Sequence, residues 1–141
     1  MSLRTPAPLV RADGPICQAV FDPPDWICPE CHDRGGRISR DEGGYEVFSA
    51  CSCLKARRRL EMFNSANIGK RFVNATLGTY KPKTKIQAAA QMKAEQFALQ
   101  YPSVEHGLLF YGPVGTGKTH LVVAIFRELT LRKGVGCRFI D

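Results

Sequence analysis

The sequence lacks the features of a membrane or secreted protein. It contains no run of roughly 20 consecutive apolar residues, the length needed to cross a bilayer. Its N-terminus, MSLRTPAPLVRADGP, has prolines where a secretory signal would have an apolar run. We therefore predict a cytoplasmic protein with no membrane partner. In that reducing compartment, its six cysteines are expected to be metal ligands or buried thiols rather than disulfides.

The composition also excludes a disordered or low-complexity chain. Apolar residues make up 44% of the sequence and charged residues 23%, both ordinary for a globular protein. A length of 141 residues fits one ordinary domain or two small ones.

Acidic residues are scarce in one segment of the chain. Between Lys55 and Lys85 there are nine basic residues and a single acid, Glu61, so this segment carries a charge of +8, while the rest of the chain is near neutral at −1. Such a stripe attracts phosphate polyanions without reading their sequence. It indicates binding to nucleic acid or to the acidic surface of a partner protein. The alternative is that these charges lie on a solvent-exposed helix and linker without a partner.

The motif with the clearest chemistry is GPVGTGKT, which matches the phosphate-binding pattern G-x-x-x-x-G-K-[ST] in full. Glycines let the backbone amides wrap around phosphates, a lysine supplies a mobile positive charge, and the final hydroxyl can bind Mg²⁺. We also include the next residue, His120, in the candidate nucleotide site; the alternative is that it is an ordinary histidine on the helix surface. The candidate ATP site therefore comprises Gly112, Pro113, Val114, Gly115, Thr116, Gly117, Lys118, Thr119 and His120.

The segments around this motif have the expected character. Residues 107–111, GLLFY, predict a buried parallel strand, residues 118–133 a helix, and residues 135–140 a second strand. A further helix is predicted over residues 85–100, with Thr84 as N-cap, Gln87 completing a capping box, and Pro102 after its end.

The parts needed for ATP hydrolysis are not visible. After Thr119 the only acids are Glu128, inside a predicted helix, and Asp141, so no acidic pair follows a later strand. Two strands are also too few for the parallel sheet on which such a loop sits. The sequence is expected to be either a fragment or a degenerate product, which binds nucleotide without hydrolysing it.

A second constellation consists of four cysteines in a C-x₂-C and a C-x-C pair: Cys28, Cys31, Cys51 and Cys53. Four thiolates can surround Zn²⁺ tetrahedrally, and a hairpin predicted over residues 36–49 would bring the two pairs together. A full sulfur shell indicates structural rather than catalytic zinc. The alternatives are a redox pair, buried thiols, or His32 replacing a ligand, while Cys17 and Cys137 are taken as bystanders.

The order of these parts resembles the DnaC/IstB-type AAA+ ATPases, the bacterial helicase loaders and transposition helpers. The resemblance rests on the four cysteines, a basic helix over residues 54–63, IGKRFVNATLGTY (residues 68–80) and LLFYGPVGTGKTHLVVAI (residues 108–125). It implies an α/β fold with a P-loop NTPase (AAA+) core, incomplete at the C-terminus and preceded by a small zinc-binding module with four cysteine ligands. The family's Walker B acids, sensor residues and arginine finger would lie beyond Asp141.

The resemblance also implies an organisation and partners. We expect a flexible arm over residues 1–25, a zinc-binding module with a basic helix over 26–66, and the N-terminal part of the AAA+ domain over 67–141. The expected ligands are ATP, Mg²⁺ through Thr119, and structural Zn²⁺. The expected partners are a replicative DNA helicase or a transposase, single-stranded DNA, and, in the full-length form, further copies in an ATP-dependent homo-oligomer. The alternatives are a truncated, non-catalytic zinc-stabilised binding module and, ranked last, an unrelated P-loop kinase.

Overall fold

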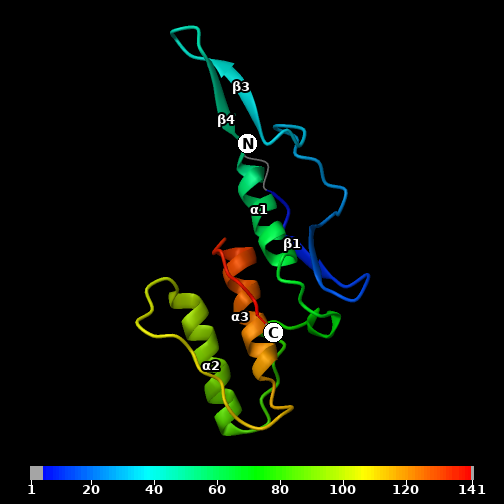
Figure 1. Cartoon of the computed structure of the whole chain (residues 1–141), viewed down its shortest axis with the longest axis vertical. Coiled ribbons are helices and arrows are strands. Elements are labelled where there is room, and N and C mark those ends of the chain that lie inside the picture. Colours follow the sequence, from blue (N-terminus) through cyan, green and yellow to red (C-terminus); the bar gives the residue numbers. More distant parts are fainter. Residues whose placement is uncertain (1–4, 141) are drawn as a thin grey trace.

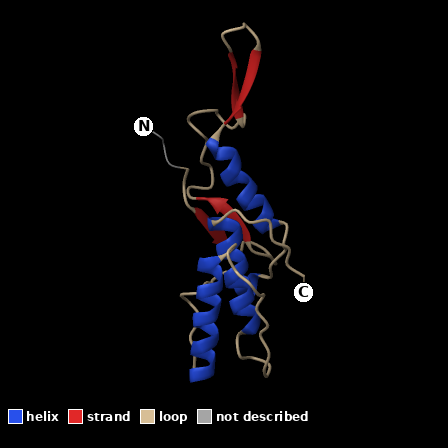
Figure 2. Cartoon of the chain, turned by 90° about the vertical axis from the view of Figure 1, so that its left-hand side faces the viewer, coloured by secondary structure: helices blue, strands red, loops and turns tan. Residues whose placement is uncertain are grey.

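The computed structural model describes residues 5–140 as an elongated molecule, with a hairpin at one end and two helices at the other (Figure 1). Its secondary structure mixes short antiparallel strands with helices, and Figure 2 shows the two strand pairs at separate levels. The elements are β1 (Pro8–Arg11), β2 (Gln18–Phe21), β3 (Gly36–Arg40), β4 (Glu46–Ala50), α1 (Ser52–Asn64), η1 (Lys70–Phe72), α2 (Lys85–Gln100), α3 (Lys118–Arg127) and η2 (Glu128–Arg132).

The N-terminal segment differs from the loose arm expected over residues 1–25. Within its described part, β1 and β2 pair antiparallel, with Leu9 opposite Val20. The loop between them is fixed to a distant segment, because the Cys17 amide donates to the Ile68 carbonyl (2.7 Å) and the Lys70 amide to that of Pro15 (2.9 Å). Residues 1–4 lie outside the described residues. The residues that hold this hairpin lie about 50 positions away in the chain, as the hydrogen bond from Cys17 Sγ to the Gly69 carbonyl shows. No local sequence pattern therefore predicts the hairpin.

The second hairpin confirms the expectation for residues 36–49. β3 and β4 pair in register, with Ile38 opposite Phe48, and the turn is closed by Asp41, whose Oδ1 accepts from the amides of Gly43 (3.0 Å) and Tyr45 (2.9 Å). Such an Asx turn is a local signal that a sequence carries on its own. The hairpin projects from the body, and all five residues of β4 are exposed.

The helices begin and end near the predicted positions. At the start of α2, Thr84 Oγ1 accepts from the Gln87 amide (3.2 Å), as the capping motif requires. The helix predicted over residues 118–133 starts as α3 and ends in the π-helical turn η2, where the Lys133 amide donates to the Glu128 carbonyl (3.3 Å). Gly134 follows with a left-handed φ of 68°. No helix in the described part of the chain is long and apolar enough to span a bilayer.

A single apolar cluster joins the first half of the chain to the helix after the glycine-rich loop. Phe63 of α1 and Phe126 of α3 have ring centroids 5.9 Å apart, and β1, β2 and Ile68 contribute side chains to the same cluster. Cys17 also lies in it; it stays outside the four-cysteine group, as expected, but it is a core residue rather than part of a loose arm. A second cluster packs α2 against α3, around Tyr80 and Leu121.

The two strands predicted around the P-loop motif do not form. Residues 107–111 are irregular, with Leu109 85% and Tyr111 89% exposed, and residues 135–140 are irregular as well. A parallel strand is held by hydrogen bonds to a neighbouring strand, and within residues 5–140 neither segment has such a neighbour. The described chain is therefore a mixed α/β structure with two short antiparallel sheets, and the prediction of these two strands was wrong for it.

Candidate functional site

The loop at residues 112–117 has a backbone that requires glycine at three positions. Gly112, Gly115 and Gly117 have φ angles of 140°, 80° and 85°. Residues with a Cβ rarely adopt these conformations, so the glycines of the motif are explained by the backbone itself. α3 begins directly after the loop at Lys118, which places the free amides of a helix N-terminus beside it.

Lys118 lies across this loop. Its Nζ donates to the carbonyl oxygens of Gly112 (2.8 Å) and Pro113 (2.7 Å). These are neutral acceptors, and a phosphate oxygen offers the ammonium group a stronger, charge-assisted bond. The arrangement keeps the lysine charge beside the loop.

The remaining residues of the motif differ in exposure and in hydrogen bonding. Val114 is fully exposed, and Thr119 is exposed in the first turn of α3. Thr116 closes the loop on itself, with its Oγ1 donating to the Pro113 carbonyl (2.9 Å). A cavity of about 250 Å³ borders the loop on the side of α2, between Phe110, Ile86 and Lys118.

His120 contacts a different part of the chain. Its Nε2 lies 3.0 Å from the Thr76 carbonyl and 3.4 Å from Thr79 Oγ1. Since a carbonyl only accepts, Nε2 carries the proton in this contact. Its half-buried ring meets that of Tyr80 edge-on, with centroids 5.4 Å apart. No sequence pattern marked Thr76 and Thr79 as neighbours of His120, or Tyr80 as a neighbour of the loop, because these contacts span about 40 residues.

The four predicted metal ligands come together at the opposite end of the molecule. The Sγ atoms of Cys28, Cys31, Cys51 and Cys53 all lie within 4.8 Å of one another. Two pairs are separated by 3.7 Å (Cys28–Cys51) and 3.4 Å (Cys31–Cys53). Tetrahedral zinc with Zn–S bonds of about 2.3 Å needs sulfur separations of about 3.8 Å. The cluster fits this ion, and these four residues would hold it in a closed sulfur shell.

The local backbone explains how the cysteines converge. The His32 amide donates to the Cys28 carbonyl (2.8 Å) and the Arg34 amide to that of Cys31 (3.0 Å), which winds the first pair into a tight turn. Asp33 Oδ1 accepts from the Cys28 amide (2.9 Å) and forms an ion pair with Arg57 on α1. His32 itself is exposed and lies outside the group of converging ligand atoms. The hairpin β3–β4 then returns the chain to Cys51 and Cys53.

The thiols of the cluster do not ionise alike. Burial by itself raises the pKa of Cys31, but hydrogen bonds from Cys53, the Gly35 backbone, Cys28 and Cys51 outweigh it and lower that pKa to about 7. Burial and the same neighbouring sulfurs raise the pKa of Cys53 to about 12. The surroundings thus favour the thiolate form at Cys31 and the protonated thiol at Cys53. A divalent cation is what would stabilise all four as thiolates.

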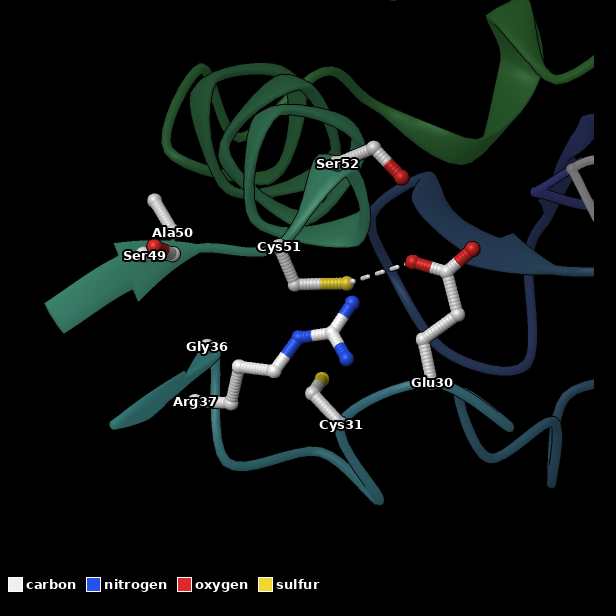
Figure 3. A pocket seen from close by; sticks show the side chains of 8 residues that line it. All are labelled: Glu30, Cys31, Gly36, Arg37, Ser49, Ala50, Cys51 and Ser52. Atoms are coloured by element: carbon white, nitrogen blue, oxygen red, sulfur yellow. Dashed lines mark hydrogen bonds between the residues drawn. The ribbon is translucent and has the colours of Figure 1, made fainter. Parts of the chain in front are cut away.

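A cavity of about 270 Å³ opens beside this cluster (Figure 3). Cys31 and Cys51 form part of its wall, and Arg37 of β3 extends into it. Glu30 Oε2 lies 3.5 Å from Cys51 Sγ. Four thiolates around Zn²⁺ carry a net charge of −2, so a guanidinium in this position offsets it while the Glu30 carboxylate opposes it.

Comparison with known proteins finds one partial similarity. Over 78 residues the chain is 32% identical to the replicative helicase loader DnaC of Escherichia coli strain K12, and the DnaC proteins of E. coli O157:H7 and Shigella flexneri match to the same extent. The match covers 55% of this chain and 32% of each DnaC, so the chain spans about a third of the length of these curated relatives. No family model matches the chain, and no solved structure does.

Proposed function

We propose that the chain binds ATP through residues 112–119 as part of a helicase-loader-like protein. The observation that carries this proposal is the position of Lys118 across a loop of left-handed glycines, at the N-terminus of α3. An anion that displaces the two carbonyls would meet the ammonium group and the free amides of the helix together. Mg²⁺ would bind the exposed Thr119 hydroxyl and the phosphates.

The similarity to DnaC supports a helicase-loader-like function, but it does not by itself support nucleotide binding. A replicative DNA helicase is accordingly the proposed partner, with a transposase as the alternative that the family resemblance leaves open. The domain boundaries after residues 25 and 66 stay predictions, and so does the assignment of residues 67–141 to a P-loop NTPase (AAA+) domain. Structural Zn²⁺ at the four cysteines would hold the hairpin end together, since β3 and β4 are exposed and have little core of their own.

The test of the nucleotide site is equilibrium titration of the chain with ATP and Mg²⁺. Replacing Lys118 by Ala removes charge-assisted bonds, so we expect roughly 10- to 100-fold weaker binding. Lys93→Ala is the matched control, because Lys93 is an exposed lysine in the middle of α2. Equal affinities of wild type and Lys118→Ala would refute the proposal.

A second function, binding of single-stranded nucleic acid, is favoured by a separate surface. A cavity of about 500 Å³ is lined by Lys70, Arg71, Phe72 and Phe139. The Arg71 guanidinium lies over the Phe72 ring, 4.7 Å from its centroid. Cations beside aromatic rings suit a strand that offers phosphates and stacking bases.

Salt dependence tests this surface. The double substitution Lys70→Ala, Arg71→Ala should reduce the slope of log affinity for oligo-dT against log salt by about 1.4, or about 0.7 for each lost phosphate contact. Lys93→Ala should leave the slope unchanged. An unchanged slope in the double variant would exclude this surface as the interface.

A further inference from the structure

A short turn from the segment before α2 lies against the glycine-rich loop. In this Thr76–Tyr80 turn, the Thr76 amide donates to Thr79 Oγ1 (2.9 Å) and the Thr79 amide to Thr76 Oγ1 (3.1 Å). The two threonines thus brace the turn from within, and Gln91 of α2 also donates to its Leu77 carbonyl (2.8 Å). The turn offers the loop a fixed surface.

Two side chains join the Thr76–Tyr80 turn to the loop and to α3. The Tyr80 hydroxyl donates to the carbonyl of Thr116 (2.8 Å), inside the P-loop motif. From the other direction, His120 of α3 donates through Nε2 to the Thr76 carbonyl (3.0 Å). The Tyr80 ring is buried in the cluster with Leu121 and Ile125, so its hydroxyl is held in place by packing.

The bond to Thr116 has a consequence for the neighbouring amide. A trans peptide is planar, and its C=O and N–H point in opposite directions. With the Thr116 carbonyl held toward Tyr80, the Gly117 N–H must point away from Tyr80. The Tyr80 ring also packs so closely that a Cβ on Gly117 would lie 2.5 Å from its Cε2 atom. The orientation of this peptide is therefore held by the hydrogen bond from Tyr80, and the nearby ring leaves room only for glycine at position 117.

We propose that Tyr80 is a positioning residue for phosphate binding, acting by orienting the Thr116–Gly117 peptide so that the Gly117 N–H can donate to a phosphate oxygen. This inference rests on the proposed nucleotide site. A peptide free to rotate would lose entropy on binding, whereas a peptide held in advance does not. His120 supports the same arrangement by fixing the Thr76–Tyr80 turn to α3.

The test compares Tyr80→Phe with wild type in binding two ligands, Mg²⁺-ATP and inorganic tripolyphosphate. The substitution keeps the ring and removes only the hydroxyl, so we expect about 3- to 10-fold weaker binding of both ligands. Equal losses are expected because the affected group faces the phosphates. Tyr101→Phe is the matched control, since Tyr101 is half-buried and packs in the same cluster.

Each other result has a definite meaning. Unchanged affinity for both ligands in Tyr80→Phe would overturn the inference. The Lys118→Ala variant would still test separately whether the loop binds nucleotide. A loss confined to ATP would show that Tyr80 contacts the nucleoside, which also overturns a positioning role. A lower unfolding temperature of the ligand-free variant, with equal effects of Tyr101→Phe, would assign Tyr80 to general stability. If Lys118→Ala binds both ligands like wild type, the nucleotide site and this inference fall together.

Discussion

Phe63 of α1 and Phe126 of α3 pack with ring centroids 5.9 Å apart, and both rings are buried in the larger apolar cluster. This contact joins the helix that carries Cys53, the last of the four cysteines, to the helix that follows the glycine-rich loop. The two candidate sites therefore lie at opposite ends of one packed body and share its stability (Figure 1).

Truncating Phe63 tests the importance of this contact. Its side chain is 1% exposed, and Phe63→Ala should lower the free energy of unfolding by about 3–5 kcal/mol, because it removes apolar contacts and leaves a cavity. Urea denaturation measures the change. Phe48→Ala on β4 is the control: its ring is 59% exposed, so an effect within about 0.5 kcal/mol is expected. Equal effects of the two substitutions would contradict the placement of the core.

Removing two sulfur ligands tests the metal site. Protein purified without chelators should contain about one zinc ion per chain, and Cys28→Ser with Cys31→Ser should contain none. The hairpin β3–β4 should then lose its protection against amide exchange, since its two ends are tied together by the cluster. Cys137→Ser, which changes a half-buried cysteine outside the cluster, should keep its zinc. Metal-free wild-type protein would refute the assignment.

Alkaline pH should destabilise the fold in part through Cys17. Burial raises the pKa of this thiol above its ordinary value of 9.0, with the nearby Arg127 charge partly offsetting the effect. The unfolded chain therefore loses this proton at lower pH than the folded chain does. The stabilisation is fully present below about pH 9 and is lost as the pH rises from there toward the folded pKa.

The measurement is the free energy of unfolding between about pH 8 and 10, in saturating zinc so that the metal ligands do not titrate. Cys17→Ala should be less stable at neutral pH, because Cys17 packs in the core and its Sγ donates to the Gly69 carbonyl (3.4 Å). Its stability should also decline less steeply as the pH rises. Parallel pH profiles for the variant and wild type would show that Cys17 does not contribute.

Features with local causes could be predicted from the sequence alone. The cap at Thr84 and the hairpin over residues 36–49 were predicted correctly, and the cap and the hairpin's turn depend on hydrogen bonds over two to four residues. The glycines at positions 112, 115 and 117 were assigned to a loop that needs glycine, and their positive φ angles agree with that. The spacing of the four cysteines, with a hairpin between the pairs, was enough to predict that their sulfurs converge.

Features that depend on distant partners became visible only in the folded chain. The β1–β2 hairpin is held to residues 68–70, and Tyr80 reaches Thr116 across 36 residues, so no local pattern indicates either contact. The opposite error arose at residues 107–111, where an apolar run has strand character but finds no neighbouring strand in the described chain. A helix makes its hydrogen bonds within its own segment, whereas a strand depends on another segment to accept and donate them. That difference is why the sequence placed the helices well and misjudged these strands.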